Sequence, residues 1–298
     1  MLMLGLALED TRSIAVRVDD RGDVEARASV AAEGDPGAAA FRALEQVAGA
    51  GGEVRLLGVA AVFPESPATA LVVAALARSF AGPFVQNGAT PAGLAGAVAE
   101  AWVGAARGVH DVVFFGVGTH TIGGIVRAGV PVTGAHGRAG SVGWLSLNPV
   151  EREDYRKAGC VEAETAAAGI VRRMIWRIKA GDRSKVQDAV RDDLSAITVD
   201  HILEAARAHD GVSISVVRDT AKYLGMAAAN LVVVADPEML VIGGIMASAA
   251  DLLLEPIRAE LARRLPKAMM DALTIEKATL GDEAVAIGAA RLAGAALR

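Results

Sequence analysis

The order of the apolar runs constrains the fold of this chain more than any other feature. The first thirty residues hold three strand-like runs joined by short turns, and strand and helix patterns then alternate up to about residue 106. The three runs cover residues 3–8, 13–18 and 24–30. Three neighbouring strands followed by strand–helix alternation are typical of one lobe of an α/β protein.

A second pattern of the same kind begins at about residue 112. It predicts strands at 112–116, 121–127, 239–242 and 275–280, and helices at 160–179, 199–208, 213–234, 250–264 and 283–297. Two similar halves predict a duplicated, two-lobed α/β architecture of the actin-like, ribonuclease H-like kind, with a central cleft. We place the smaller lobe at 1–107 plus 282–298, with a returning C-terminal helix, and the larger lobe at 108–281.

Composition argues against several classes of protein. Hydrophobic residues make up 53% of the 298 residues, but no apolar run reaches the ~18 residues of a membrane span. The net charge is −5, and the densest basic cluster, Arg172, Arg173, Arg177 and Lys179, lies in an amphipathic run that indicates a solvated helix face rather than a nucleic-acid surface. The single cysteine, Cys160, allows no internal disulfide, which fits the cytoplasm.

Four motifs, together with the closing segment Ala284–Ala293, carry a family resemblance. The four motifs read Phe-Val-Gln-Asn-Gly-Ala-Thr at 84–90, Gly-Thr-His-Thr-Ile-Gly-Gly at 118–124, Gly-Ala-His-Gly-Arg-Ala-Gly at 134–140 and Ala-Asp-Pro-Glu-Met-Leu-Val-Ile-Gly-Gly at 235–244. In order and spacing, they resemble the sugar kinases and repressors of the ROK (repressor, ORF, kinase) family. The resemblance runs along nearly the whole chain, and it implies an actin-like sugar kinase fold with a nucleotide site and a sugar site.

The catalytic position of this resemblance holds a glycine. Family kinases have an Asp after the Asn of the first motif, and that Asp deprotonates a sugar hydroxyl. Here Asn87 is followed by Gly88, which cannot accept a proton. We therefore assign no catalytic residue.

The first phosphate turn of the family is also altered. In the family it is an Asp followed two residues later by Gly-Gly-Thr, and aligning on Gly5 puts Ala7 at the Asp, Glu9 and Asp10 at the glycines, and Thr11 at the Thr. Ala7 cannot bind magnesium, and two carboxylates repel a polyphosphate. We interpret the turn as an exposed hairpin turn, with a metal held by the two acids as the alternative.

The second phosphate turn keeps its ends and changes in the middle. His120 and Ile122 stand where the family has glycine, and their side chains obstruct backbone approach to a phosphate. His120 is interpreted as a loop residue without a role, with anion binding by its protonated ring as the alternative. The remaining vestigial nucleotide-binding residues are Thr11, Thr119, Gly243 and Gly244.

About half of the family's polar sugar contacts remain. The resemblance assigns ligand binding to Asn87, His136 and Glu162, and Ser141 stands where the family has a sugar-binding Glu. Each retained residue also has a purely structural interpretation. Asn87 is then a helix cap, His136 a loop residue, and Glu162 a member of a solvated first turn.

The family's structural zinc is not expected here. Such a site needs four ligands, which the family supplies as one His and three Cys. Trp144 replaces the His, and Cys160 is the only cysteine. We expect a small apolar knot of Trp144, Leu145, Leu147 and Tyr155 in place of the metal, and no cofactor, with ATP and magnesium doubtful.

These observations predict a cytoplasmic, non-catalytic ROK-like protein that binds a carbohydrate or a protein partner, and that is a homodimer without membrane or nucleic-acid binding of its own. One alternative is an ATP-dependent sugar kinase of the glucokinase or N-acetyl amino sugar kinase type, with Glu65, His136 or Glu162 as a substitute base. Another is the effector module of a ROK transcriptional regulator that lacks its winged helix, because the chain begins at the first strand.

Overall fold

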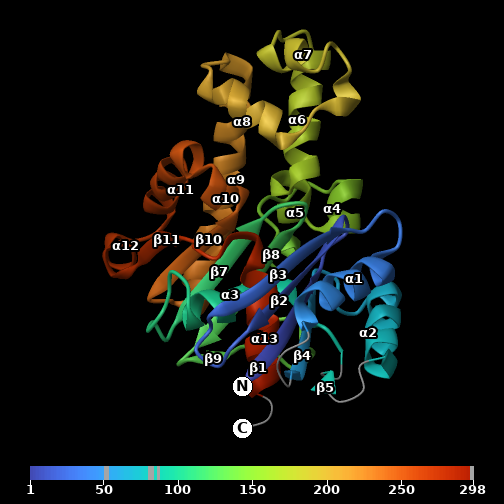
Figure 1. Cartoon of the computed structure of the whole chain (residues 1–298). Helices are drawn as coiled ribbons and strands as arrows, with labels where there is room; N and C mark the ends of the chain where they lie inside the picture. The colour runs from blue at the N-terminus through green and yellow to red at the C-terminus, as the bar shows by residue number, and fades with distance from the viewer. Residues whose placement is uncertain (50–53, 80–83, 86–87, 296–298) are drawn as a thin grey trace. The chain divides into compact units, whose positions relative to one another are not determined.

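The computed structural model describes residues 1–49, 54–79, 84–85 and 88–295 (Figure 1). The chain divides into two compact units. The first contains Met1–Phe114, Gly123–Gly140 and Ala278–Arg298, and the second contains Phe115–Ile122 and Ser141–Lys277. The lobe limits inferred from the sequence remain a prediction. No helix in the described ranges is long and apolar enough to cross a membrane.

The first unit is built on a six-stranded sheet. Its strands are, in spatial order, β3 (Val24–Ala31), β2 (Arg12–Val18), β1 (Leu2–Leu8), β4 (Val54–Ala61) and β5 (Phe84–Val85), with β6 (Thr90–Pro91) beside β4. β2 is antiparallel to both of its neighbours, whereas β4 is parallel to β1. The predicted meander of three strands is therefore confirmed.

Alternate residues of β1 face two different layers of helices. Leu4 and Leu6 belong to a buried cluster with residues of α1 (Pro36–Ala48) and α2 (Pro67–Ser79). Residues of the opposite parity, such as Met3 and Ala7, belong to clusters with α3 (Ala92–Trp102) and α13 (Ala284–Ala295). This alternation follows from the period of two in a strand, and it explains why β1 is apolar on both faces.

Small residues allow α13 to lie directly on the sheet. A Cβ at Gly5 would be 1.9 Å from the carbonyl oxygen of Ala286, and one at Gly58 would be 1.9 Å from that of Ala289. A Cβ at Gly288 would be 1.8 Å from the carbonyl oxygen of Ala95 in α3. The Ala/Gly composition of the last helix is thus a packing requirement.

The second sheet has five strands, and the second unit adds most of the helices. In spatial order the strands are β11 (Thr274–Lys277), β10 (Met239–Gly244), β7 (Val112–Val117), β8 (Thr121–Arg127) and β9 (Val130–Pro131). The helices of the second unit that matter for the site or for stability are α5 (Cys160–Thr165), α6 (Ala167–Lys179), α9 (Gly211–Ala235) and α11 (Ala250–Arg264).

The helix predicted at 160–179 is two helices. Ala166 has an extended conformation, with φ −64° and ψ 159°, and separates α5 from α6. The backbones of α5 and α6 approach each other closely at this break. A Cβ at Gly169 would lie only 2.2 Å from the carbonyl oxygen of Ala163. The apolar period continues across the break, so the sequence pattern alone did not reveal it.

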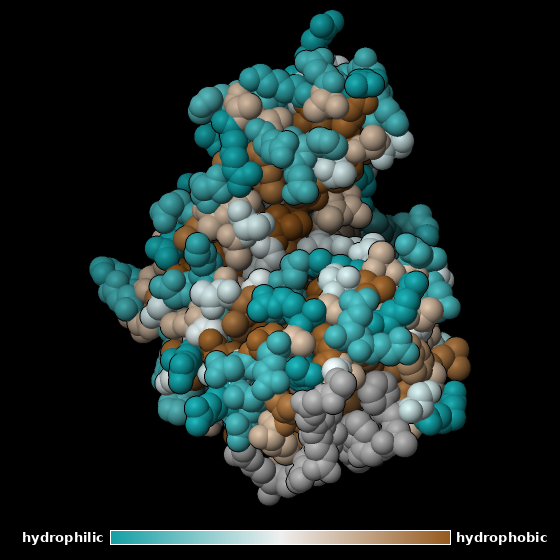
Figure 2. Space-filling model, viewed as in Figure 1, coloured by the Kyte–Doolittle hydropathy of each residue, from teal (hydrophilic) through white to brown (hydrophobic). Residues whose placement is uncertain are grey.

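Apolar and hydrophilic residues are interspersed on the face of the molecule shown in Figure 2. Large exposed apolar side chains within the described ranges include Leu71, Trp144, Trp176 and Val234, which lie on different elements. Nothing in this distribution identifies a dimer surface, so the homodimer stays a prediction.

Candidate ligand site

The turn between β7 and β8 is held in place by backbone hydrogen bonds within the second unit. The Gly118 N–H donates to the carbonyl oxygen of His120 over 2.9 Å, and the Ala167 N–H donates to that of Gly118 over 2.9 Å. The turn is therefore tied to the beginning of α6. This defines the direction in which the His120 side chain leaves the backbone.

The carboxylate of Glu162, on α5, is bound by this turn. One oxygen lies 2.7 Å from Nδ1 of His120, and the other accepts a hydrogen bond of 2.6 Å from the Thr121 N–H. The side chains of His120 and Glu162 are only 19% and 15% exposed. Glu162 does lie in the first turn of α5, as its structural interpretation has it, but this turn is not solvated. His120 is a turn residue with a side-chain partner, and whether it has a role in ligand binding stays a prediction.

The Thr121 side chain orients its own backbone N–H. Its hydroxyl lies 3.1 Å from that of Thr165, which in turn donates to the carbonyl oxygen of Val161 over 2.8 Å. On the other side, a Cβ at Gly143 would approach Oε2 of Glu162 to 3.4 Å. The carboxylate thus lies between the Thr121 N–H donor and Gly143.

The turn between β1 and β2 in the first unit is a hairpin turn, as predicted. The Glu9 N–H donates to the carbonyl oxygen of Arg12 over 3.0 Å, and Nε of Arg12 lies 2.7 Å from Oε2 of Glu9. Arg12 also pairs with Asp282 at 2.9 Å. Ala7 is 1% exposed within β1, and Thr11 is exposed in the turn. Arg12, which the sequence analysis did not consider, thus partly neutralises Glu9 and Asp282.

His136 lies in the first unit, exposed, in the Gly134–Gly140 turn. Two residues later, Arg138 binds Glu65 through two nitrogens, with Nε 3.0 Å from Oε1 and Nη2 2.8 Å from Oε2. The hydrogen bonds from Arg138 hold the pKa of Glu65 below its ordinary value, and the nearby His136 acts in the same direction. A carboxyl group held in this way is a weaker base.

The remaining positions predicted for the sugar site are 87, 88 and 141. Asn87 lies outside the described residues. Gly88 is exposed with φ +99°, and a Cβ there would meet nothing within 4 Å, so an aspartate would have room but a strained backbone. Ser141 is exposed and precedes the short 3-10 helix Val142–Trp144.

The glycine turn after β10 is required by close backbone packing. Gly244 has φ +61°, and a Cβ there would lie 2.1 Å from the carbonyl oxygen of Val117. Gly243 is buried, and Thr119 is exposed in its own turn. Gly244 therefore has a structural reason to be glycine, whether or not a nucleotide is bound.

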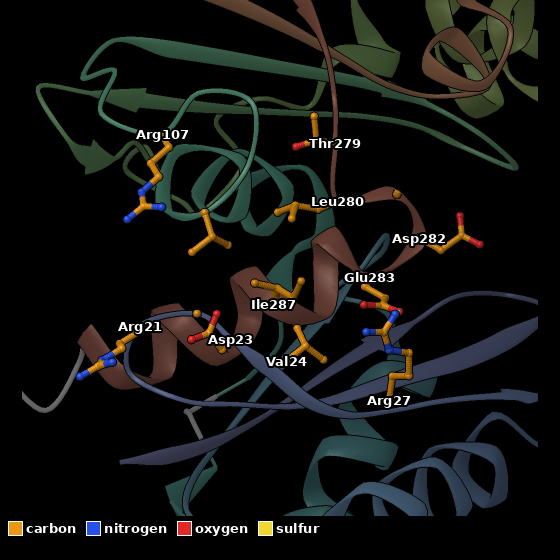
Figure 3. Close-up of a pocket in the computed structure, with 13 residues that line it drawn as sticks. Arg21, Asp23, Val24, Arg27, Arg107, Thr279, Leu280, Asp282, Glu283 and Ile287 are labelled. Carbon is orange, nitrogen blue, oxygen red and sulfur yellow. The ribbon is translucent and has the colours of Figure 1, made fainter.

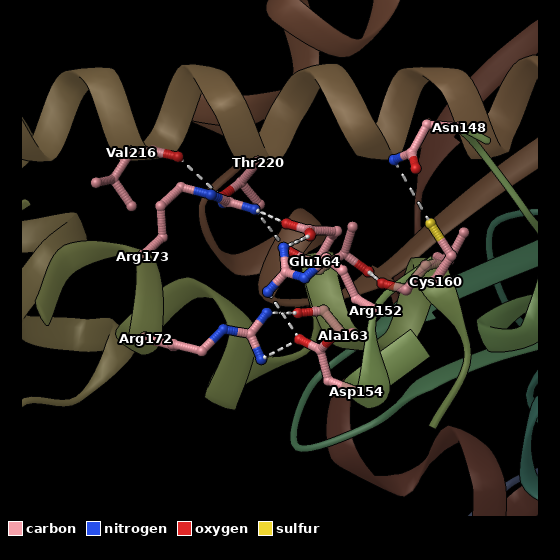
Figure 4. Close-up of polar contacts among 12 residues, drawn as sticks. Asn148, Arg152, Asp154, Cys160, Ala163, Glu164, Arg172, Arg173, Val216 and Thr220 are labelled. Carbon is pink, nitrogen blue, oxygen red and sulfur yellow. Dashed lines mark hydrogen bonds and ion pairs between the residues drawn. The ribbon is translucent and has the colours of Figure 1, made fainter. Parts of the chain in front are cut away.

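The expected apolar knot is not formed, because Trp144 is 60% exposed. The segment is instead held by the carboxylate of Glu164, whose side chain is 6% exposed (Figure 4). It accepts hydrogen bonds from Arg152 at 3.0 Å, from the Tyr155 hydroxyl at 2.5 Å and from Arg173 at 2.7 Å. Burial, followed by the bond to Glu164, raises the pKa of Tyr155 to about 12.

Arg172 and Arg173 of α6 belong to this network, which corrects the expectation of a solvated face for these two residues, whereas Lys179 is exposed. Arg172 pairs with Asp154 at 3.0 Å and donates to the carbonyl oxygen of Ala163 over 2.7 Å. The Trp176 ring lies against Arg152 and Arg172, with centroid distances of 5.3 and 5.2 Å. Within the ranges that the structure describes, no three His, Cys, Asp or Glu residues are grouped to hold a metal.

A cavity of about 590 Å³ opens in the first unit (Figure 3). Its apolar lining includes Val24, Leu280 and Ile287, and an ion pair of 3.0 Å between Arg27 and Glu283 forms part of its wall. These oppositely charged wall residues satisfy each other, so the cavity by itself indicates no ligand class.

Two residues that line this cavity, Thr279 and Leu280, are hydrogen-bonded to the buried Glu100, which is 0% exposed. Its carboxylate accepts hydrogen bonds from the N–H groups of Ala105 at 2.7 Å, Thr279 at 3.1 Å and Leu280 at 3.0 Å. A buried carboxylate needs such donors to offset its desolvation. Glu100 thus joins the end of α3 to the segment before α13.

Comparison with known proteins identifies the family of the chain. The model of the ROK family matches residues 84–296. The glucokinase of Halalkalibacterium halodurans is 35% identical over 195 residues, which are 64% of this chain and 58% of the glucokinase. The xylose repressor of Caldicellulosiruptor bescii is 29% identical over 202 residues, or 65% of this chain and 48% of the repressor. The matches thus span about half the length of these curated relatives.

Solved structures show the same fold over the whole chain. A ROK family glucokinase from Streptomyces griseus, in complex with glucose and AMPPNP, has a TM-score of 0.81 at 24% identity and covers 99% of this chain and 100% of its own. The ROK hexokinase from Thermus thermophilus has a TM-score of 0.71 at 25% identity, with 100% of both chains covered. These likenesses confirm the predicted actin-like α/β fold class, and together with the family model they show that this chain belongs to the ROK family.

Proposed function

We propose that this chain is a carbohydrate-binding ROK protein that does not transfer phosphate. The observation that carries the proposal is the state of the turn between β7 and β8. His120 fills the middle of that turn, and its ring is bound to Glu162 at 2.7 Å. Phosphoryl transfer depends on open backbone N–H groups that position and stabilise the phosphates, and a bound imidazole replaces that opening with a side chain.

The turn between β1 and β2 supports the same proposal. By the resemblance, it places Glu9 and Asp10 where family kinases have glycines, and Arg12 of the same turn is paired with Glu9 and Asp282. Arg12 is already engaged by two carboxylates, those of Glu9 and Asp282. A phosphate there would have to displace these partners and approach like charges.

The missing base is the third support. Gly88 has no proton acceptor, and losing a general base costs about 10²–10⁴ in rate. Its positive φ means that the local backbone suits glycine rather than aspartate. The proposal includes the absence of an ATP–magnesium cofactor and of a structural zinc, a cytoplasmic location and a homodimeric state.

A sugar is the proposed ligand class because of what Glu162 retains. A carboxylate has about four lone-pair sites, and His120 and Thr121 use one on each oxygen. The remaining sites suit a pair of neighbouring hydroxyl groups. From the family resemblance alone, Asn87, His136 and Ser141 are also proposed as ligand-binding residues. The relatives' names make glucose and N-acetylglucosamine the first sugars to test.

The test combines a binding assay with a turnover assay. We expect glucose, N-acetylglucosamine or a related hexose to raise the melting temperature, and ATP with magnesium to have no effect. No ADP should form with any sugar of the panel. Glu162→Gln should remove the thermal shift, whereas Glu276→Gln, a matched change at an exposed position of the same unit, should not. Sugar-dependent ADP release that depends on Glu162 would overturn the proposal.

The second candidate function is an ATP-dependent sugar kinase with a substitute base. The 35% identity to a glucokinase favours it. Glu65, His136 and Glu162 are the candidate bases, but Glu65 and Glu162 are already engaged by Arg138 and His120. ADP release abolished by one of the substitutions Glu65→Gln, His136→Asn or Glu162→Gln would identify this function and its base.

The third candidate is an effector module of a transcriptional regulator. The matches to the xylose repressor and to the N-acetylglucosamine repressor of Escherichia coli favour it. A sugar that binds without turnover fits this candidate as well. A sugar-dependent change in sedimentation or in binding to a protein partner would distinguish it from simple sugar storage or transport.

A further inference from the structure

We propose that His120 is a positioning residue, which holds the Glu162 carboxylate in the orientation that a sugar recognises. The inference rests on the proposed sugar binding and deepens it. The resemblance assigns glycine to this position, so the role belongs to this chain and not to the family pattern. The same imidazole that fills the phosphate turn would then serve the sugar site.

The geometry gives the carboxylate two different donors. Nδ1 of His120 lies 2.7 Å from Oε1, and the Thr121 N–H lies 2.6 Å from Oε2. With one donor on each oxygen, the carboxylate plane cannot rotate without breaking a charge-assisted hydrogen bond. One lone pair on each oxygen remains available, so two adjacent sugar hydroxyls can donate to it side by side.

Both donors come from one rigid turn. The Thr121 hydroxyl is linked through Thr165 to the carbonyl oxygen of Val161, so the N–H and the carboxylate are fixed by neighbouring parts of α5. The turn is also attached to Ala167 at the start of α6 through the carbonyl oxygen of Gly118. Because this turn is fixed, His120 and the Thr121 N–H restrict the orientation of the Glu162 carboxylate before a sugar binds.

Restricting the acceptor in advance increases affinity because less conformational freedom is lost on binding. Glycine at position 120 has no side-chain donor. The carboxylate would then keep a single donor, and its side chain would sample other rotamers before a sugar bound. Removal of one charge-assisted hydrogen bond at a half-buried acid leads us to expect a loss of about tenfold in sugar affinity.

The experiment compares three variants by isothermal titration calorimetry with glucose and with N-acetylglucosamine. His120→Gly should weaken binding about tenfold. His120→Asn should keep affinity within about threefold of the wild type, because its amide nitrogen can donate from nearly the same place as Nδ1. His209→Gly is the matched control. His209 is exposed in the same unit with φ +60°, so glycine fits its backbone, and affinity should not change.

A second readout follows the imidazole itself. In the protein labelled with ¹⁵N-histidine, we expect a downfield Nδ1–H resonance from His120, which disappears in His120→Asn and moves in Glu162→Gln. Saturating sugar should shift it, because the hydroxyls and the imidazole share one acceptor. A structural role alone would not make this signal respond to sugar.

The outcomes separate the two proposals. If the wild type binds neither sugar, the proposed function fails and the role of His120 fails with it. If the wild type binds but His120→Gly binds equally well, the proposed function stands and the positioning role is wrong. Equal losses in His120→Gly and His120→Asn would also contradict it, because they would show that the ring fills space rather than donating to Glu162.

Discussion

The turn between β1 and β2 and the turn between β7 and β8 each hold a charged pair where the resemblance expects glycines nearby, and the two pairs differ in how exposed they are. In the first, Glu9 and Arg12 form a pair near the surface, with 32% and 34% of their side chains exposed, and Asp282 is 71% exposed. In the second, His120 and Glu162 are only 19% and 15% exposed. Similar substitutions thus produced a solvated ion pair in one unit and a sheltered, oriented carboxylate in the other.

Burial decides how much such a pair contributes. Exposed ion pairs are screened by water and contribute about 0–1 kcal/mol, whereas a sheltered charge depends on every donor around it. The comparison therefore predicts that perturbing the second unit's charged groups has large effects and that perturbing the hairpin turn has small ones.

The largest effect is expected at Glu164, an ion-paired acid of the second unit whose side chain is only 6% exposed. Glu164→Ala should lower the free energy of unfolding by about 3–5 kcal/mol, because it leaves the half-buried Arg152 and Arg173 without their shared partner. Urea denaturation measures the change. The control is Glu153→Ala, whose side chain is 74% exposed and should cost about 0.5 kcal/mol or less. Equal effects would refute the argument from burial.

The next effect is on ligand binding. Glu162→Gln should weaken sugar binding by about 10–100-fold, since the amide replaces a charged acceptor with a neutral one and turns one acceptor atom into a donor. Glu9→Gln should leave sugar affinity unchanged. Calorimetric titration of both variants measures this contrast. A loss of similar size in Glu9→Gln would mean that the two turns do not differ in the way proposed.

A smaller expected effect is the pH-dependent contribution of Asp210 to the free energy of unfolding. Burial alone would raise the pKa of Asp210, but hydrogen bonds from Ser213, Lys185 and Ser184 hold it below its ordinary value. A depressed carboxyl pKa contributes stability above the unfolded value of about 3.9, and that stability is lost as the pH falls through the folded value.

The corresponding experiment compares two helix caps, Asp210 at α9 and the exposed Asp35 at α1. Asp210→Ala should cost about 1–2 kcal/mol at pH 7, and the difference from the wild type should shrink below about pH 4. Asp35→Ala should cost about 0.5 kcal/mol, because its side chain caps with one hydrogen bond, from the Ala38 N–H at 2.9 Å. Denaturation at several pH values tests both, and a cost for Asp210→Ala that does not vary with pH would contradict the linkage.

The smallest effect is expected at the hairpin turn itself. Arg12→Ala removes both of its ion pairs and should change the free energy of unfolding by about 0–1 kcal/mol, without effect on sugar affinity. Thermal denaturation and titration measure the two quantities. A loss of sugar binding in this variant would give the first turn a ligand role that its exposure does not support.

Local signals in the sequence predicted the elements well. The three-strand meander and the long helix near 213–234 depend on the periodicity of apolar residues, which is a local property of the sequence. The family motifs added the fold class. The sequence analysis did not predict the break at Ala166, because the apolar period continues past this single residue with an extended ψ.

The side-chain partners required the tertiary structure. His120 and Glu162 are 42 positions apart, and Arg138 and Glu65 are 73 apart, so no spacing rule connects them. The apolar knot was wrong for the same reason, since the partner of Tyr155 and Arg152 is Glu164 from another helix. From the sequence alone came the α/β order, the family and the absence of a proton acceptor at position 88. Only folding decided which charges meet and how deeply they are sheltered, because those depend on distances in space between residues that are remote along the chain.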